Sequence, residues 1–199
     1  MRKILLFVLF SFFSTAVFAQ DALKEYRARN YQVSVDICKS EIEGEKATVD
    51  TYCVLIWSLN KLKSYREALS YGDMALKLYK DMRIVEGMGV SYYYLGDYAK
   101  AMNNFKAYKA KQPDGPFVDD VCYFMGEIYI RNGEFNNADI SLSEAVQRYP
   151  KLASWWTRLG FAREQAGSIE LAVIAYEEAL KLNKNYADAK KGLARVKGE

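Results

Sequence analysis

The sequence contains no histidine, only three prolines and only three cysteines in 199 residues. Without histidine, there is no imidazole for general acid–base catalysis or for binding a metal ion. The cysteines, Cys38, Cys53 and Cys122, have no Cys-x-x-Cys spacing, which argues against a zinc site and against a dithiol redox pair. Nucleophile-elbow, P-loop and dinucleotide-binding motifs are also missing. We therefore expect a protein that is not an enzyme and that holds no cofactor and no metal ion.

The scarcity of proline leaves few residues that would interrupt helices. Hydrophobic residues make up 51% of the chain and charged residues 27%. This balance is typical of globular proteins and differs from that of disordered chains, which have low hydrophobicity and high net charge. The composition therefore favours a folded, helix-rich protein.

The first nineteen residues have the pattern of a secretory signal peptide. Arg2 and Lys3 form a short basic region, residues 4–13 are apolar, and Val17 and Ala19 are small residues at the two positions that a signal peptidase reads. The apolar run is about 15 residues long, shorter than the ~20 residues of a membrane-spanning helix. We expect cleavage between Ala19 and Gln20, a periplasmic or secreted protein, and no integral membrane segment after cleavage.

The expected mature chain has nearly balanced charge. Removing Arg2 and Lys3 leaves 26 basic and 25 acidic residues. This balance gives no electrostatic reason to expect nucleic acid or an anionic membrane as the partner. An exported chain with three cysteines keeps at least one free thiol, and the sequence permits a Cys38–Cys53 disulfide without indicating it.

A short motif recurs along the rest of the chain. Gly126 and Gly160 each follow Met or Leu, and the interval between them is repeated, with a few added residues, between Gly89 and Gly126. The added residues belong to a loop at 113–116. A second set of glycines recurs at similar intervals between predicted helices, at Gly96, Gly133 and Gly167. That position suits the left-handed residue that often ends a helix, so the spacing predicts repeated pairs of helices.

Each predicted pair has an apolar face. In residues 119–131, four residues share one helical face: Cys122, Met125, Gly126 and Tyr129. In residues 135–148, the apolar face carries Ala138, Leu142, Ala145 and Val146. Small residues at Gly126 and Ala138 allow the paired helices to cross closely. One pair cannot bury its apolar face alone, so we expect at least three pairs to stack.

This pattern resembles the tetratricopeptide-repeat (TPR) family, whose motif is W-x2-L-G-x2-Y followed by A, F and P within a repeat length of about 34 residues. The resemblance covers residues 49–184 and implies an all-α, right-handed superhelical solenoid of helix–turn–helix pairs. The implied organisation is a signal peptide (1–19), a degenerate N-terminal helical pair (20–48), four repeats (about 49–81, 82–115, 119–152 and 153–186), and a C-terminal capping helix with a tail (186–199). The first of the four repeats departs from the motif, with Ile56 in place of glycine and Gly72 in place of the aromatic residue.

The resemblance also implies where a partner binds, because the first helix of each pair lines a concave groove in this family. The expected groove residues lie one step round each first helix from the core stripe: Trp57, Asn60, Lys61, Arg83, Glu86, Val90, Tyr93, Tyr94, Asp120, Tyr123, Glu127, Ile130, Arg131, Ser154, Thr157, Phe161, Glu164 and Gln165. Aromatic residues and arginine are the types that anchor binding hot spots. The family's carboxylate clamp is not matched, because Cys53 and Trp57 stand where lysine and asparagine are needed.

We therefore expect an exported adaptor or scaffold that binds a protein or peptide partner in its concave groove. An alternative is a structural subunit of a cell-envelope assembly that uses its convex face or ends, with Trp155 and the tyrosine-rich surface buried in the interface. The least favoured hypothesis is a cell-wall carbohydrate binder that stacks sugars on exposed aromatic residues such as Tyr94.

Overall fold

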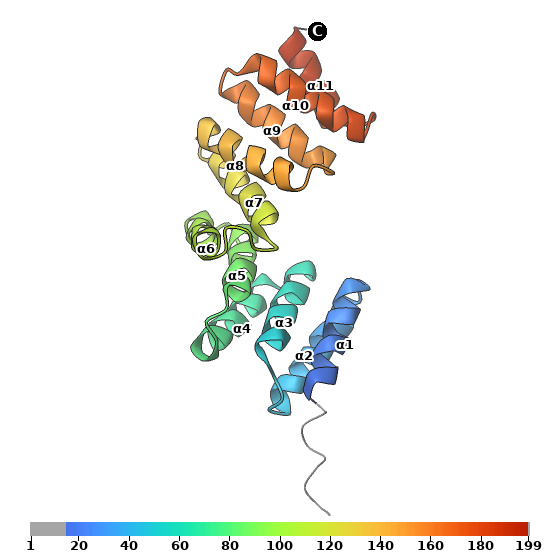
Figure 1. Ribbon diagram of the computed structural model, residues 1–199, viewed down its shortest axis with the longest axis vertical. Coiled ribbons are helices and arrows are strands. Elements are labelled where there is room, and N and C mark those ends of the chain that lie inside the picture. The colour runs from blue at the N-terminus through green and yellow to red at the C-terminus, as the bar shows by residue number, and fades with distance from the viewer. Residues whose placement is uncertain (1–14, 199) are drawn as a thin grey trace, which may run out of the picture. The chain divides into compact units, whose positions relative to one another are not determined.

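The computed structural model describes residues 15–198, with side chains from Asp21 onward. Within this range every regular element is an α-helix, as predicted (Figure 1). The helices are α1 (Thr15–Arg27), α2 (Tyr31–Glu43), α3 (Val49–Lys61), α4 (Tyr65–Leu78), α5 (Met82–Tyr94), α6 (Tyr98–Lys111), α7 (Val118–Arg131), α8 (Phe135–Arg148), α9 (Ala153–Gln165), α10 (Ile169–Leu182) and α11 (Ala187–Lys197).

The chain forms two compact units. The first unit contains α1 to α5 and ends at Asp97, and the second begins at Tyr98 and contains α6 to α11. The boundary falls between the two helices of the predicted repeat 82–115. Within each unit, helices that follow one another in the chain lie side by side (Figure 1).

The odd-numbered helices of each unit form a closely packed row. In the first unit α3 contacts both α1 and α5, and in the second unit α9 contacts both α7 and α11. Within the described residues, the backbones of α2 and α4, and those of α8 and α10, do not approach one another in this way, although the Lys39–Glu67 ion pair at 2.7 Å links α2 to α4. The first helices of the pairs therefore approach one another more closely than the second helices do. We call the odd-numbered helices of each unit its inner row.

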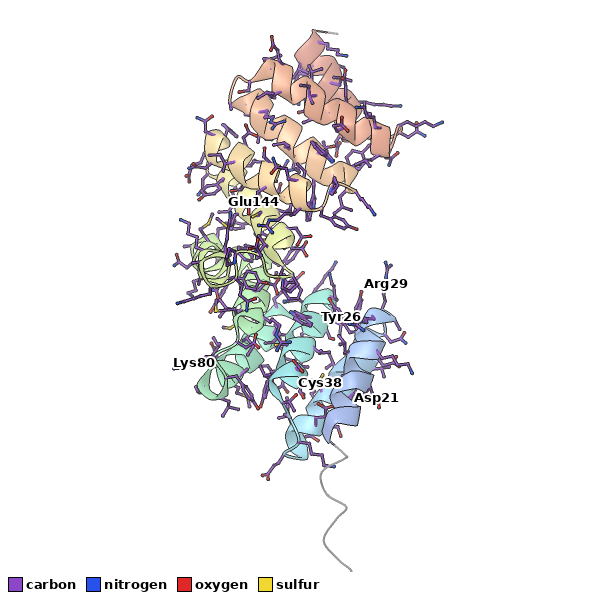
Figure 2. The ribbon with its side chains drawn as sticks, viewed as in Figure 1. Asp21, Tyr26, Arg29, Cys38, Lys80 and Glu144 are labelled. Atoms are coloured by element: carbon purple, nitrogen blue, oxygen red, sulfur yellow. The ribbon has the colours of Figure 1, made fainter. Side chains whose placement is uncertain are left out.

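Five turns that join a first helix to a second helix share one geometry. Each contains one left-handed residue: Arg29 (φ 66°), Lys63 (φ 63°), Gly96 (φ 84°), Gly133 (φ 76°) and Gly167 (φ 80°). The left-handed residue and the next one donate to carbonyls three and five residues back; Gly133 donates to Ile130 at 3.0 Å and Glu134 to Tyr129 at 2.9 Å. This is the Schellman ending of a helix. Arg29, at the end of α1 (Figure 2), and Lys63 lie one repeat length apart, so α1–α2 is in register with the later pairs.

The core of the second unit contains most of the predicted apolar stripe, with Tyr129 only half-buried. The buried residues include Cys122, Met125 and Gly126 of α7 and Ala138, Leu142, Ala145 and Val146 of α8. A Cβ added to Gly126 would lie 2.5 Å from Leu142 Cγ. The two helices can therefore approach this closely only because residue 126 has no side chain. One repeat later, a Cβ on Gly160 would lie 2.7 Å from Tyr176 Cδ1. The predicted close crossing is confirmed.

In the first unit, the small and the large residue of the helix crossing exchange places. Ile56 holds the position of the motif glycine on α3, and Gly72 holds that of the large residue on α4. A Cβ on Gly72 would lie 2.6 Å from Met88 Cγ, and a Cβ on Gly87 would lie 2.6 Å from Ile56 Cγ2. The departures from the motif therefore compensate, because Ile56 and Met88 fill space that glycines on neighbouring helices leave.

The three cysteines are buried free thiols. Burial raises the pKa of Cys38 and of Cys53 to about 12 and that of Cys122 to about 11. Thiols with such pKa values stay protonated at neutral pH and are poor nucleophiles. Cys38 lies on α2 inside the core of the first unit (Figure 2), and Cys122 is in the core as predicted. All three act as small apolar core residues.

At the N-terminus, the basic and apolar regions of the predicted signal peptide lie outside the described residues. The predicted cleavage site between Ala19 and Gln20 falls within α1. No helix in residues 15–198 has both the length and the apolar character that a bilayer span requires. At the other end, Leu193 and Val196 of α11 pack against the buried face of α10, as predicted.

Candidate partner-binding surfaces

In the first unit, five predicted groove residues keep part of their surface available: Trp57, Lys61, Val90, Tyr93 and Tyr94. Tyr94 is the most prominent, with 54% of its surface exposed. Its ring stacks on Tyr65 with centroids 5.0 Å apart, and the Tyr93 ring meets it edge-on at 5.3 Å. These three tyrosines form a cluster that involves the C-terminal end of α5 and the start of α4.

Two other predicted residues of this unit are turned to internal contacts. Asn60 bridges α3 and α5, because its Nδ2 donates to the Gly87 carbonyl at 2.8 Å and its Oδ1 accepts from Ser91 Oγ at 2.6 Å. Glu86 is only 5% exposed. Neither side chain offers much surface to a partner.

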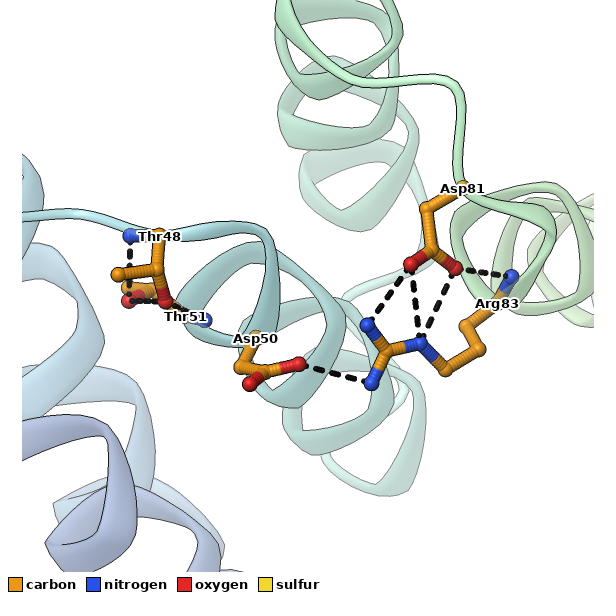
Figure 3. A network of polar contacts seen from close by, with 5 residues as sticks. All are labelled: Thr48, Asp50, Thr51, Asp81 and Arg83. Atoms are coloured by element: carbon orange, nitrogen blue, oxygen red, sulfur yellow. Dashed lines mark hydrogen bonds and ion pairs between the residues drawn. The ribbon is translucent and has the colours of Figure 1, made fainter. Parts of the chain in front are cut away.

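Arg83 connects the beginning of α5 to the beginning of α3. Its Nη1 lies 2.8 Å from Asp50, and its Nη2 lies 2.7 Å from Asp81 (Figure 3). Asp81 also caps α5 by accepting from the Arg83 backbone N–H at 2.8 Å. The hydrogen-bonded guanidinium lowers the pKa of Asp81. The charge of Arg83 is therefore used to hold helix ends together.

In the second unit, the inner row contains a pocket of about 340 Å³ between α7, α9 and α11. We call it the α7–α9–α11 pocket. Its lining residues are Tyr123, Ser154, Thr157, Arg158, Phe161, Tyr176, Tyr186, Asp188, Lys191 and Arg195. A volume at the lower end of the ligand-pocket range suits one or two side chains of a partner.

The pocket lining repeats along the chain. Tyr123, Thr157 and Lys191 follow one another at intervals of one repeat length, and Arg195 follows Phe161 at the same interval. Helix α11 is therefore in register with the first helices α7 and α9, and it contributes groove positions as well as covering the last pair. The sequence-based prediction gave α11 a capping role alone and missed Lys191 and Arg195. One further step of the repeat would have found both.

Aromatic rings form much of the wall. Tyr123 stacks on Trp155 with centroids 4.9 Å apart and planes inclined by 10°. The Arg158 guanidinium lies 5.3 Å above the Phe161 ring. Trp155 is only 6% exposed. The expectation that Trp155 is available to an assembly interface is therefore wrong, because this ring packs beneath Tyr123.

A polar network supports the pocket. Glu164 Oε2 accepts from Tyr176 Oη at 2.7 Å and from Arg195 Nη2 at 2.7 Å. The Arg195 guanidinium lowers the pKa of Glu164, and burial together with Glu164 raises the pKa of Tyr176. Arg158 Nε donates to Glu127 at 2.5 Å. Glu127 and Glu164 thus orient the arginines that line the pocket.

The remaining predicted residues of this unit lie elsewhere or point inward. Thr157 touches the pocket but is 7% exposed, and its hydroxyl donates to the Ala153 carbonyl at 2.8 Å. Asp120 and Arg131 are exposed and Ile130 is half-buried, and none of the three lines the pocket. The Arg131 guanidinium lies 4.5 Å above the Tyr98 ring. Among the described residues, no group of three or more acidic or cysteine side chains is arranged to hold a metal ion.

Comparison with known proteins places this helical arrangement in a family. The tetratricopeptide-repeat models match residues 87–115, 119–152 and 153–186. The chain belongs to the TPR family. No curated protein matches it in sequence.

Solved structures with similar folds are distant in sequence. A chain of the APC/C hetero-tetramer Cut9–Hcn1 superposes with a TM-score of 0.79 at 16% identity, over 92% of this chain and 36% of that one. This protein thus spans about a third of that relative. A thermophilic TPR protein of Thermus thermophilus superposes with a TM-score of 0.67 at 15% identity, over 94% of this chain and 100% of that one. A TPR protein of Parabacteroides merdae superposes with a TM-score of 0.68 at 16% identity, over 92% of this chain and 72% of that one. At these identities the similarity establishes the fold alone.

Proposed function

We propose that the protein is an exported TPR adaptor or scaffold that binds a segment of a protein partner along its inner rows of helices. The observation that carries this proposal is the α7–α9–α11 pocket, most of whose lining comes from equivalent positions of three successive first helices, with Tyr176 added by α10. Aromatic and arginine side chains, the types that dominate binding hot spots, gather there. The partly exposed Trp57 and the tyrosine cluster at Tyr94 offer similar chemistry in the first unit.

Affinity capture from an extract of the cell envelope tests this proposal. The bait is the full chain, compared with a Trp57→Ala, Tyr94→Ala variant of the first unit and a Phe161→Ala variant of the second. The matched control is Ile140→Ser on α8, one of the even-numbered helices, which we call the outer helices. We expect one protein to be retained by the wild type and by the control and to be lost with one of the inner-row variants. Retention by all four baits would refute binding on the inner rows.

Export is a separate part of the proposal and needs its own measurement. The basic and apolar regions before Ala19 support it, as does the small residue at the expected cleavage site. The intact mass of the protein recovered from its own cells should correspond to a chain that begins at Gln20. Recovery of the unprocessed chain from the cytosol would contradict export.

A second candidate function is that of a structural subunit of an envelope assembly that binds through the outer helices. Three large apolar side chains of α8 and α10 favour it: Ile140 is 69% exposed, Leu171 45% and Ile174 50%. Large apolar side chains left exposed can belong to an interaction surface. In the capture experiment, loss of the retained protein with Ile140→Ser and its retention by the inner-row variants would move this function ahead.

A further inference from the structure

We infer that the α7–α9–α11 pocket recognises an acidic peptide segment that carries an aromatic residue beside its carboxylate. This inference rests on the proposed function and specifies the chemistry of the partner at one site. It follows from the charge of the lining residues, from the rings in the wall and from the size of the pocket.

The charged groups of the lining are mostly basic. Arg158, Lys191 and Arg195 line the pocket together with one carboxylate, Asp188, while Glu127 and Glu164 pair with Arg158 and Arg195 from outside the lining. Lys191 is exposed and makes no ion pair within the described residues. Arg195 uses Nε and Nη2 for Glu164, and Tyr176 also interacts with its guanidinium. Lys191 is therefore the cationic donor that a partner's acceptor would satisfy, with the Arg195 guanidinium beside it.

The two donors on α11 are placed to act together. Lys191 and Arg195 are four residues apart, which puts them on the same face of the helix, one turn from each other. Glu164 fixes the Arg195 guanidinium through two hydrogen bonds, so this side chain is already oriented before a partner arrives. A preorganised arginine with a lysine one turn away favours a carboxylate over a cation, because a cationic partner would meet like charges.

The apolar part of the lining specifies the second element of the ligand. Rings of Tyr123, Phe161 and Tyr186 surround the same pocket, and Tyr123 is held flat against the buried Trp155. Flat, rigid faces of this kind stack on aromatic side chains. A volume of about 340 Å³ leaves room for one large side chain and the start of its neighbour.

The experiment is a selection of a random 12-residue peptide library displayed on phage against the purified full chain. The same selection is run with Lys191→Glu and with the matched control Lys190→Glu. Both lysines are exposed on α11, but only Lys191 lines the pocket. Selected peptides are then synthesised and their affinities for the three proteins are measured by fluorescence anisotropy.

We expect the wild type and Lys190→Glu to enrich sequences with Asp or Glu next to Phe, Tyr or Trp. Binding of these peptides to Lys191→Glu should weaken about tenfold, because one attractive charge becomes repulsive. Replacing the aromatic residue of the peptide by alanine should weaken binding to a similar extent. Thermal melts of both variants verify that the fold is kept.

Two other outcomes are decisive. Enrichment of peptides without acidic and aromatic residues, or equal affinity for Lys191→Glu and Lys190→Glu, overturns this inference but leaves peptide binding on the inner row in place. A selection that enriches no peptide at all overturns both the inference and the proposed function.

Discussion

The Leu142 side chain of α8 fills the space that Gly126 of α7 leaves open, and Leu142 Cγ lies 2.5 Å from the position that a Gly126 Cβ would take. Leu142 is fully buried, so its side chain has nowhere to move. We predict that Gly126→Leu destabilises the second unit by roughly 1–3 kcal/mol through overpacking. Thermal unfolding followed by circular dichroism should show a fall in Tm of several degrees. Ala107→Leu, at an exposed position of α6, is the control.

A double-mutant cycle tests the contact itself. Leu142→Ala alone leaves a cavity, and Gly126→Ala alone crowds Leu142, so each single change should lower the free energy of unfolding. The double variant should lose less stability than the sum of the two single losses, because the new methyl group enters the vacated space. Strict additivity would mean that the two residues do not meet.

Lys63 supports a second prediction, because it stands at a left-handed position where three later turns have glycine. A residue with a Cβ costs roughly 1–2 kcal/mol in this conformation, while glycine costs about 0.5–1 kcal/mol in unfolded-chain entropy, so we expect Lys63→Gly to stabilise the chain by about 0.5–1 kcal/mol. Chemical unfolding in urea measures the change. The control, Lys61→Gly at the exposed end of α3, should destabilise because helices disfavour glycine. A loss of stability in Lys63→Gly would contradict the shared turn geometry.

The same turns explain which parts of the fold the sequence revealed. Gly126, Gly133, Gly160 and Gly167 mark crossings and turns where only glycine fits well, so the later pairs could be located by spacing. The N-terminal pair looks degenerate in the sequence because Arg29 adopts the left-handed conformation without being glycine. Composition does not indicate such a residue. Only the regular spacing to Lys63 would have indicated it.

The candidate site was predicted in outline for a related reason. Helical register places Trp57, Tyr94, Tyr123 and Phe161 on first helices, and register can be read from one segment alone. The internal partners of Asn60 and Arg83 depend on how neighbouring helices are rotated against each other. That rotation is a property of packed pairs, so the sequence could not separate residues that hold helices together from residues that face a partner.

Glu41 supports a prediction about pH. It is 5% exposed, and its Oε2 accepts from Thr51 Oγ1 at 2.5 Å, while Thr51 forms a capping box with Thr48 at the start of α3 (Figure 3). Burial raises the pKa of Glu41. The folded state therefore favours the protonated carboxyl, and the stability from this group is lost as pH rises through the raised pKa.

Glu41→Gln removes the ionisation and keeps an oxygen for Thr51. We expect the free energy of unfolding of this variant, relative to the wild type, to increase as pH rises above the ordinary carboxyl pKa of about 4.3 and to level off above the raised pKa of Glu41. Urea unfolding at several pH values checks this trend. Glu43→Gln, at an exposed position of the same helix, is the matched control. Parallel stability profiles for Glu41→Gln and the wild type would show that Glu41 is not destabilised by burial.

Glu164 attaches α11 to the last helical pair. Its Oε2 accepts from Arg195 of α11 and from Tyr176 of α10, both at 2.7 Å, and Arg195 lowers its pKa. Because the pKa is lowered, the ionised Glu164 stabilises the folded state above the ordinary pKa of a carboxyl, and this stability is lost as pH falls through the lowered pKa. Since the Arg195 side chain is 54% exposed, the pair contributes about 0.2–1 kcal/mol.

We predict that Glu164→Gln speeds hydrogen exchange of the α11 amides by about two- to fivefold at neutral pH, because α11 detaches more often. In the wild type, protection of these amides should decline on acidification, whereas in Glu164→Gln it should be lower and insensitive to pH. Lys197→Met, which breaks the more exposed pair with Glu177 at 3.1 Å, should have a smaller effect. If Glu164→Gln leaves the exchange unchanged, packing of Leu193 and Val196 alone holds α11. Lys191 would then owe its place at the pocket to those two side chains and not to Glu164.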